Sequence, residues 1–207
     1  MFSFFKRKKS KSSRGVSYYD RENIVHTIKD LGGIFNYKSI SEYTTDKIIK
    51  FNGLALSNIN KQNVLKVFNK PDCTINKLDN IDNYEILFYR HSLEKFTFLM
   101  QFHFYDDKFL FVSNMVNSSG IISKAEKQSF IQKIDDKYFL ESNIDFDEGL
   151  EVKIIDKNDN FISVVDGVNF RVNYLNKSSF DILLKNNPNI LKQLGSYNKE
   201  DKIDDYF

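Results

Sequence analysis

The stretch EKFTFLMQFHFYDDKFLFVSNM, residues 94–115, alternates aromatic with other side chains on either side of a short polar segment. Alternation of this kind is typical of β-strands, because successive side chains of a strand point to opposite faces of its sheet. Asp106, Asp107 and Lys108 interrupt the pattern and predict the turn of a hairpin. The stretch therefore predicts two antiparallel strands, and a protein built around a sheet.

The same alternation gives the first strand two faces of different character. One face carries five apolar residues that we expect in the core: Phe96, Phe98, Met100, Phe102 and Phe104. The other face mixes polar and apolar side chains and is predicted to bind a partner protein; with one residue from the preceding strand, it consists of Tyr89, Leu99, Gln101, His103 and Tyr105. Tyrosine is common at binding hot spots. The alternative is a face covered by the chain's own helices, and the sequence does not choose between the two.

A helix is predicted upstream of these strands, in NINKQNVLKVFNKPD, residues 58–72. Asn60 is a candidate N-cap, because its side chain can accept a hydrogen bond from a free amide of the first turn. Asn69 tolerates the left-handed conformation that often ends a helix, and Pro71 prevents continuation. The apolar stripe of this helix is Val64, Leu65, Val67 and Phe68. A further helix is predicted from Asp20 as its N-cap, with Gly32 and Gly33 as its stop.

A weak repeat with a spacing of 66 residues suggests that this organisation occurs twice, with helices starting near Asn60 and Ser123. We therefore predict an α+β fold of two helix-then-antiparallel-sheet modules in tandem, with an N-terminal helix and a short C-terminal helical segment. The predicted divisions are a flexible basic arm (1–18), an N-terminal module (19–118), a C-terminal module (119–195) and an acidic tail (196–207).

The segment 58–72 resembles the start of the small fold shared by outer-membrane assembly lipoproteins of the SmpA/OmlA type and by β-lactamase inhibitor protein. In that fold a threonine-capped helix ends in a glycine-x-proline turn; here Asn60 stands at the threonine position, Asn69 stands at the glycine, and 70–72 fits the turn. The likeness covers roughly 58–115 and, more faintly, 123–175, but Cys73 is internal, so the lipidation signal is missing. The resemblance implies tandem modules that bind proteins on a sheet face without catalysis. Cytoplasmic immunity proteins of bacterial toxin systems are similar in style.

The sequence contains none of the common catalytic or nucleotide-binding motifs, such as a P-loop, H-E-x-x-H, G-x-S-x-G or C-x-x-C. His26, His91, His103 and Cys73 are dispersed, and we expect neither a metal site nor a cofactor. DKNDN, residues 156–160, lacks the glycine and distal glutamate of a calcium loop and predicts a hairpin turn instead. Paired acids, including 106–107 and 135–136, are also expected at turns. The favoured function is a non-enzymatic protein-binding module: an immunity protein or inhibitor that occludes a toxin or enzyme.

The charge distribution separates the N-terminus from the rest of the chain. Six Lys and Arg residues precede Asp20, and since the whole chain carries +2, the remainder carries −4. A mildly acidic body argues against a nucleic-acid partner. A single cysteine fits a reducing compartment, and no apolar run reaches the ~20 residues of a membrane span. We therefore expect a cytoplasmic protein.

The basic N-terminal arm suggests an alternative function, a peripheral membrane-associated assembly or scaffold factor held at the inner membrane. Its residues for a weak contact with an anionic bilayer are Phe2, Phe4, Phe5, Lys6, Arg7, Lys8 and Lys9. The other interpretation of the arm is a disordered start that aids solubility.

Overall fold

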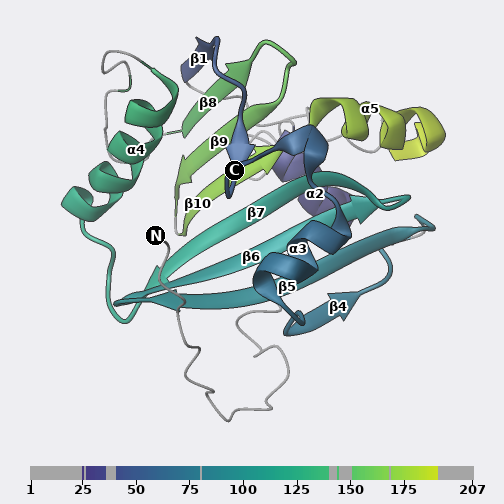
Figure 1. Ribbon diagram of the computed structural model, residues 1–207, viewed down its shortest axis with the longest axis horizontal. Helices are drawn as coiled ribbons and strands as arrows, with labels where there is room; N and C mark the ends of the chain where they lie inside the picture. Colours follow the sequence, from purple (N-terminus) through teal and green to yellow (C-terminus); the bar gives the residue numbers. More distant parts are fainter. Residues whose placement is uncertain are drawn as a thin grey trace, which may run out of the picture.

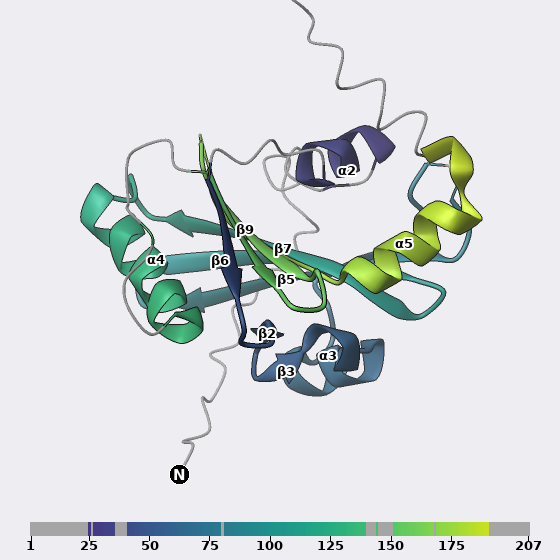
Figure 2. The same cartoon turned by 90° about the horizontal axis from the view of Figure 1, so that it is seen from above.

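The computed structural model describes residues 25, 27–35, 41–79, 81–139, 144, 151–167 and 169–190. They form one large sheet with helices on both of its faces (Figure 1; Figure 2). The predicted basic arm, Asp20, His26 and the acidic tail lie outside the described residues.

The sheet has eight strands in the order β1-β8-β9-β10-β7-β6-β5-β4. Along the chain, these strands are β1 (Ser41–Thr45), β4 (Cys73–Ile75), β5 (Tyr84–Leu93), β6 (Phe96–Tyr105), β7 (Lys108–Ser118), β8 (Glu151–Asp156), β9 (Phe161–Asp166) and β10 (Phe170–Leu175). β1 and β8 run parallel, and the other neighbours run antiparallel. A separate small hairpin consists of β2 (Lys50–Phe51) and β3 (Leu54–Ala55), followed by the 3-10 turn η1 (Leu56–Asn58).

The predicted tandem of two separate helix-then-sheet modules is wrong. The chain does place a helix before a three-stranded meander twice, α3 (Lys61–Phe68) before β5–β7 and α4 (Lys124–Tyr138) before β8–β10. However, β7 pairs antiparallel with β10 over residues 111–116 and 170–175, so both meanders join one sheet. Pairing the two strands satisfies backbone groups that separate sheets would leave at open edges. The predicted division at residue 118 falls in the connection between β7 and α4, and the sheet runs across it.

The predicted helix starts near Asn60 and Ser123 are confirmed. The Asn60 side chain accepts a hydrogen bond from the amide of Asn63 at 2.9 Å, as an N-cap should. Ser123 forms a capping box with Glu126, each side chain accepting a hydrogen bond from the other residue's amide. Asn69 ends α3 with a positive φ of 63°.

The N-terminal helix differs from the prediction. α2 (Ile28–Phe35) runs through Gly32 and Gly33, so these glycines do not stop it. Its start is marked by Thr27 and Asp30, since each side chain accepts a hydrogen bond from the other residue's amide, at 2.9 and 3.1 Å. The predicted C-terminal helical segment contains α5 (Lys177–Asn186), which Asn176 caps. Among the helices that the structure describes, none has both the length and the apolar character needed to cross a bilayer.

Helices cover both faces of the sheet, which gives the protein two main apolar cores. We call the side of α3 and α4 the front face; its core includes Val64 of α3, Ile131 of α4, Met100, Phe102, Phe104, Ile162 and Val164. We call the side of α2 and α5 the back face; its core includes Leu31 of α2, Leu183 of α5, Ile86, Phe111 and Leu175. Figure 2 shows α2 on the opposite side of the sheet from α3. A third, small cluster joins Phe88, Leu99 and Met115.

Candidate functional site

The five residues predicted to form the partner-binding face are all buried. Their exposed fractions are 2% for Tyr89, 3% for Leu99, 2% for Gln101, 0% for His103 and 8% for Tyr105. In this structure they cannot present an exposed contact surface. Four of them lie on the back face. This face is covered by the chain itself, as the alternative interpretation predicted.

Polar back-face residues of β6 are held by internal hydrogen bonds. The amide of Val25 donates to Oε1 of Gln101 at 2.8 Å. The Tyr105 hydroxyl accepts from Nδ2 of Asn187, just beyond α5, at 3.2 Å. A buried polar group is tolerated when it is hydrogen-bonded, so these side chains have structural roles.

His103 and Tyr84 form the most deeply buried titratable pair of this face. The Tyr84 hydroxyl lies 3.0 Å from Nδ1 of His103, and the imidazole stacks on Phe111 with ring centres 3.9 Å apart. Nε2 of His103 is buried without a hydrogen-bond partner. Burial lowers the pKa of His103 well below its ordinary value and raises that of Tyr84, so both side chains are neutral at pH 7. The pair resembles a catalytic dyad only in its distance, because no substrate can reach side chains that are 0% and 1% exposed.

Tyr89 lies on the front face, contrary to the prediction. It stands directly opposite Met100 in the β5–β6 register, and directly opposed residues of paired strands share a face. Its ring contacts Phe68 and Phe102, with ring centres 5.4 and 5.7 Å away, and its hydroxyl donates to the carbonyl of Asn69 at 3.0 Å. Burial and, to a smaller extent, the negative charges of two nearby carboxylates raise the pKa of Tyr89 to about 12. Tyr89 therefore fastens α3 to the sheet.

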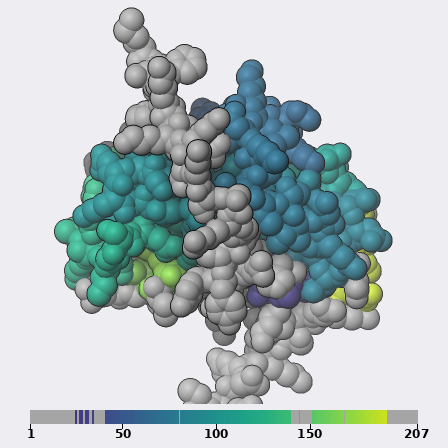
Figure 3. Space-filling model, turned by 90° about the horizontal axis from the view of Figure 1, so that it is seen from below, coloured from purple at the N-terminus to yellow at the C-terminus, as the bar shows by residue number. Residues whose placement is uncertain are grey.

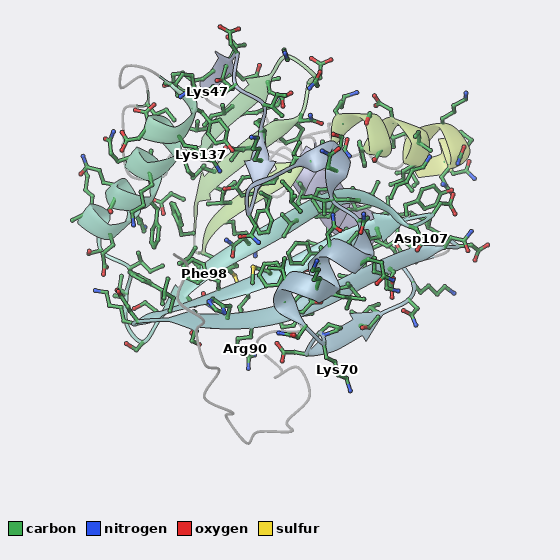
Figure 4. All side chains as sticks on the ribbon, in the orientation of Figure 1. Lys47, Lys70, Arg90, Phe98, Asp107 and Lys137 are labelled. Carbon is green, nitrogen blue, oxygen red and sulfur yellow. The ribbon has the colours of Figure 1, made fainter. Side chains whose placement is uncertain are left out.

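The front face has an exposed part at the end of the β5–β6 hairpin. Register places Leu93 opposite Phe96 and His91 opposite Phe98, and alternation puts all four side chains on the front face. His91 and Leu93 are exposed, Leu93 by 46%, whereas Phe96 and Phe98 are half-buried. We call these four residues the aromatic strip. Figure 4 shows Phe98 in the part of the sheet between α3 and α4.

Contacts with α4 hold the strip in place. The Phe130 ring meets Phe96 and Phe98 edge to face, with ring centres 5.1 and 6.4 Å away. Lys95, at the hairpin turn, forms an ion pair with Glu126 and lies 5.5 Å from the centre of the Phe96 ring. The hydrogen bond from Lys95, then those from the amide and hydroxyl of Ser123, lower the pKa of Glu126 to about 2. The first turn of α4 is thereby joined to the hairpin.

The outer edge of β5 is only partly paired. β4 pairs with Ile86–Phe88, and the Asp72 side chain then accepts a hydrogen bond from the amide of Arg90 at 2.7 Å. From His91 to Leu93, no strand of the described residues pairs with this edge. Backbone groups at such an edge can pair with an added strand.

The other sequence candidates do not come together. His91 lies at the exposed end of β5 on the front face, His103 is buried on the back face, and Cys73 is half-buried in β4. Within the described ranges, no group of three His, Cys, Asp or Glu residues could hold a metal ion. The arm residues proposed for membrane contact lie outside those ranges.

The DKNDN segment is confirmed as the β8–β9 turn. Asp156 Oδ1 accepts from the amides of Asn158 and Asn160 at 2.8 and 3.1 Å, and Oδ2 accepts from the amide of Ile49 at 3.0 Å. Asp106–Asp107 also forms the predicted hairpin turn, with φ values of 47° and 59°. Asp135 and Asp136, by contrast, lie within α4 and not at a turn.

Comparison with known proteins adds little. No protein-family model matches the sequence. No curated protein matches it either. A solved structure of a cysteine-rich secretory protein from Staphylococcus aureus matches with 12% identity, covering 67% of this chain and 51% of that chain, at a TM-score of 0.34. The chain thus spans about half the length of that protein, and at this TM-score the match supports no inference about fold or function.

Proposed function

We propose that the protein is a non-enzymatic protein-binding module that occludes a toxin or an enzyme, in the manner of an immunity protein or inhibitor. The observation that supports this proposal is the aromatic strip, where exposed Leu93 and His91 stand beside half-buried Phe96 and Phe98. The single cysteine, Cys73, fits a reducing compartment, so we propose that this binding takes place in the cytoplasm.

The strip has the physical character of a binding hot spot. Apolar side chains that are still in contact with water gain about 25 cal/mol for each Å² that a partner covers. Phe96 and Phe98 are already held by Phe130, so little side-chain entropy is lost when a partner binds. The Lys95–Glu126 ion pair borders the apolar surface with polar groups, as at the rim of many interfaces.

The partner would meet two kinds of contact at this surface. Its apolar side chains would pack on the strip, and an extended segment could pair with the open edge of β5 at 91–93. The resemblance to β-lactamase inhibitor protein, which remains a prediction, agrees with this use of a sheet face.

Site-specific crosslinking tests the location. A photoreactive phenylalanine analogue replaces Phe98 in one full-length variant and Lys157, an exposed residue of the β8–β9 turn, in a control. After irradiation in cells of the source organism, we expect one dominant protein adduct at position 98 and none at 157. Adducts at 157 alone, or at neither position, would contradict the strip as the binding site.

Substitutions then test the function on the crosslinked protein, purified separately. Wild-type protein in equimolar amount should abolish its enzymatic or toxic activity. Leu93→Asp should restore that activity, because the partner would bury an unpaired carboxylate. Leu54→Asp, which adds the same charge at an exposed leucine of β3, should still inhibit. A captured protein whose activity is the same with and without wild-type protein would refute the inhibitor hypothesis.

A further inference from the structure

A second exposed surface lies where the chain enters the β2–β3 hairpin beside the end of α4. It consists of Lys47, Ile48, Lys50, Leu54 and Lys137, which we call the hairpin surface. Ile48 is 40% exposed and Leu54 is 36% exposed, and Lys47 and Lys50 are exposed as well. The two partly exposed apolar side chains thus lie beside exposed cations.

Hydrogen bonds connect the parts of the hairpin surface. Nζ of Lys137 donates to the carbonyl of Lys50 at 3.2 Å, and Nζ of Lys47 donates to the carbonyl of Lys137 at 3.0 Å. The Tyr138 hydroxyl lies 3.1 Å from both the amide and the carbonyl of Lys50. The β2–β3 hairpin is thus fixed to the end of α4.

The exposed charges of this surface are mostly positive. Three exposed lysines adjoin two exposed acids, Asp46 and Asp136, while Asp135 and Asp156 beside them are buried. The carboxyl end of α4 carries a partial negative charge that stabilises Lys47 and Lys137 where they are. The exposed charges of these segments therefore sum to +1, on a domain whose sequence, without the arm, is mildly acidic.

The shape of this region is a projection. Figure 2 shows the β2–β3 hairpin and α3 together as the outermost layer on the front side of the sheet. In Figure 3 the blue part of the chain, which includes α3, stands out from the rest of the described surface. α3 also combines a cation with an exposed apolar side chain, since Lys66 is exposed and the neighbouring Val67 is 48% exposed.

We propose that the hairpin surface docks the folded domain on an anionic lipid bilayer. This role goes beyond the proposed protein-binding function and uses different residues from the aromatic strip. Ile48 and Leu54 stand on a projecting hairpin, so they can enter the headgroup region while the lysines remain at the level of the lipid charges.

The chemistry favours a bilayer over an acidic protein. Lysine is a flexible point charge without the planar fork that arginine uses for bidentate recognition, and all the cations here are lysines. Diffuse attraction to many headgroups needs no fixed geometry, whereas a specific protein partner does. The apolar side chains also project singly from a convex region.

Vesicle flotation of the full-length protein tests the charges. The probe is a vesicle of phosphatidylserine and phosphatidylcholine in equal amounts. The charge variant is Lys47→Gln, Lys50→Gln and Lys137→Gln, in which glutamine can still donate to the carbonyls. The matched control removes three exposed lysines elsewhere and is Lys77→Gln, Lys108→Gln and Lys185→Gln. Both leave the basic arm intact.

Each lysine at the lipid surface contributes about a five-fold increase in affinity, so the charge variant should bind about 100-fold more weakly. The control should lose less than about five-fold, because charges beyond a Debye length are screened. Equal binding of the two variants, or no flotation of the wild-type protein, would overturn the proposal. Unchanged thermal melting of the charge variant confirms that it is folded. If it melts early, Lys50→Glu with Lys66→Glu replaces it, since neither ammonium is held by an interaction among the described residues.

A second pair of variants tests the apolar contribution and the choice of partner. Ile48→Ser with Leu54→Ser should weaken flotation at physiological salt, whereas Leu93→Ser with Ile121→Ser, which removes two other exposed apolar side chains, should not. Soluble polyglutamate serves as the acidic-protein probe. If polyglutamate binding depends on the three lysines and flotation does not, the surface binds acidic proteins and the bilayer assignment is wrong.

Discussion

Acidification should destabilise this fold through His103. Its imidazole is fully buried, with Nδ1 on the Tyr84 hydroxyl and Nε2 without a partner. Burial places the pKa of His103 in the fold well below its ordinary value of 6.5. In the unfolded chain the same side chain takes up a proton near that ordinary value. The unfolded state therefore gains a proton first, and the free energy of unfolding decreases as the pH falls through 6.5 toward the pKa in the fold.

The magnitude follows from proton linkage. While the unfolded chain is protonated and the fold is not, one group removes about 1.4 kcal/mol of stability for each pH unit. Between about pH 7 and pH 5, His103 should cost about 2 kcal/mol. That is a large part of the 5–15 kcal/mol typical of a whole domain.

Comparison with His103→Gln isolates this contribution. Glutamine does not titrate and can still reach Tyr84, so wild type should be the more stable protein at pH 7, and its advantage should shrink by about 2 kcal/mol at pH 5. Urea denaturation followed by far-ultraviolet circular dichroism measures both proteins, since the chain has no tryptophan to report by fluorescence. His91→Gln, at an exposed position, should leave the pH dependence of wild type as it is. An advantage of wild type that stays constant from pH 7 to pH 5 would refute the reasoning.

Three further predictions concern stability measured by urea denaturation. Phe102→Ala should cost about 3–5 kcal/mol because the side chain is 0% exposed, whereas half-buried Phe98→Ala should cost about 1 kcal/mol; equal costs would contradict the difference in burial. Asp156→Ala should cost at least about 2 kcal/mol, because the buried amide of Ile49 loses its acceptor; a smaller cost would show that another group replaces the carboxylate. Asp107→Gly should stabilise the protein by about 0.5 kcal/mol, because glycine adopts the φ of 59° without strain and the strain energy removed exceeds the entropy cost of glycine. A loss of stability would show that the Asp107 side chain stabilises the fold by more than its backbone strain costs.

The local elements could be predicted because their signals lie within a few residues. Asn60 and Ser123 each hydrogen-bond an amide three positions later. The N-cap pattern predicted the helix start at Asn60, whereas the start near Ser123 was predicted from the weak repeat. Asp106 and Asp107 form the hairpin turn by their own backbone conformation. α2 was placed less well, because Gly32 and Gly33 lie inside the helix and its start depends on Thr27 and on a hydrogen bond to distant Asp79.

The assignment of the faces failed because alternation shows which side chains share a face but not what covers it. Gln101 belongs to a row of directly paired polar residues that are all buried: Gln101, Ser113, Asn173 and Ser163. Their burial depends on helices from opposite ends of the chain, α2 and α5. Nothing in the strand itself encodes that coverage.

The pairing that joins the two meanders into one sheet could not be predicted from local sequence signals either. The β7–β10 register joins Phe111 to Leu175, and pairing at such a separation depends on the competition among all open edges. The aromatic strip has the same origin. The edge of β5 at 91–93 is open because β4 begins at Cys73, which pairs with Phe88, a limit set in another part of the chain.

The β7–β10 pairing also has a consequence for synthesis on the ribosome. β7 ends at Ser118, but its partner is complete only when Leu175 has been added. At about 5–20 residues per second, the nascent chain exposes one edge of a long apolar strand for several seconds. Such an edge is a template for pairing with another chain. Chaperones that shield extended apolar segments should therefore be needed most while residues 119–175 are being translated, and synonymous codons that slow elongation there should increase aggregation of the newly made protein.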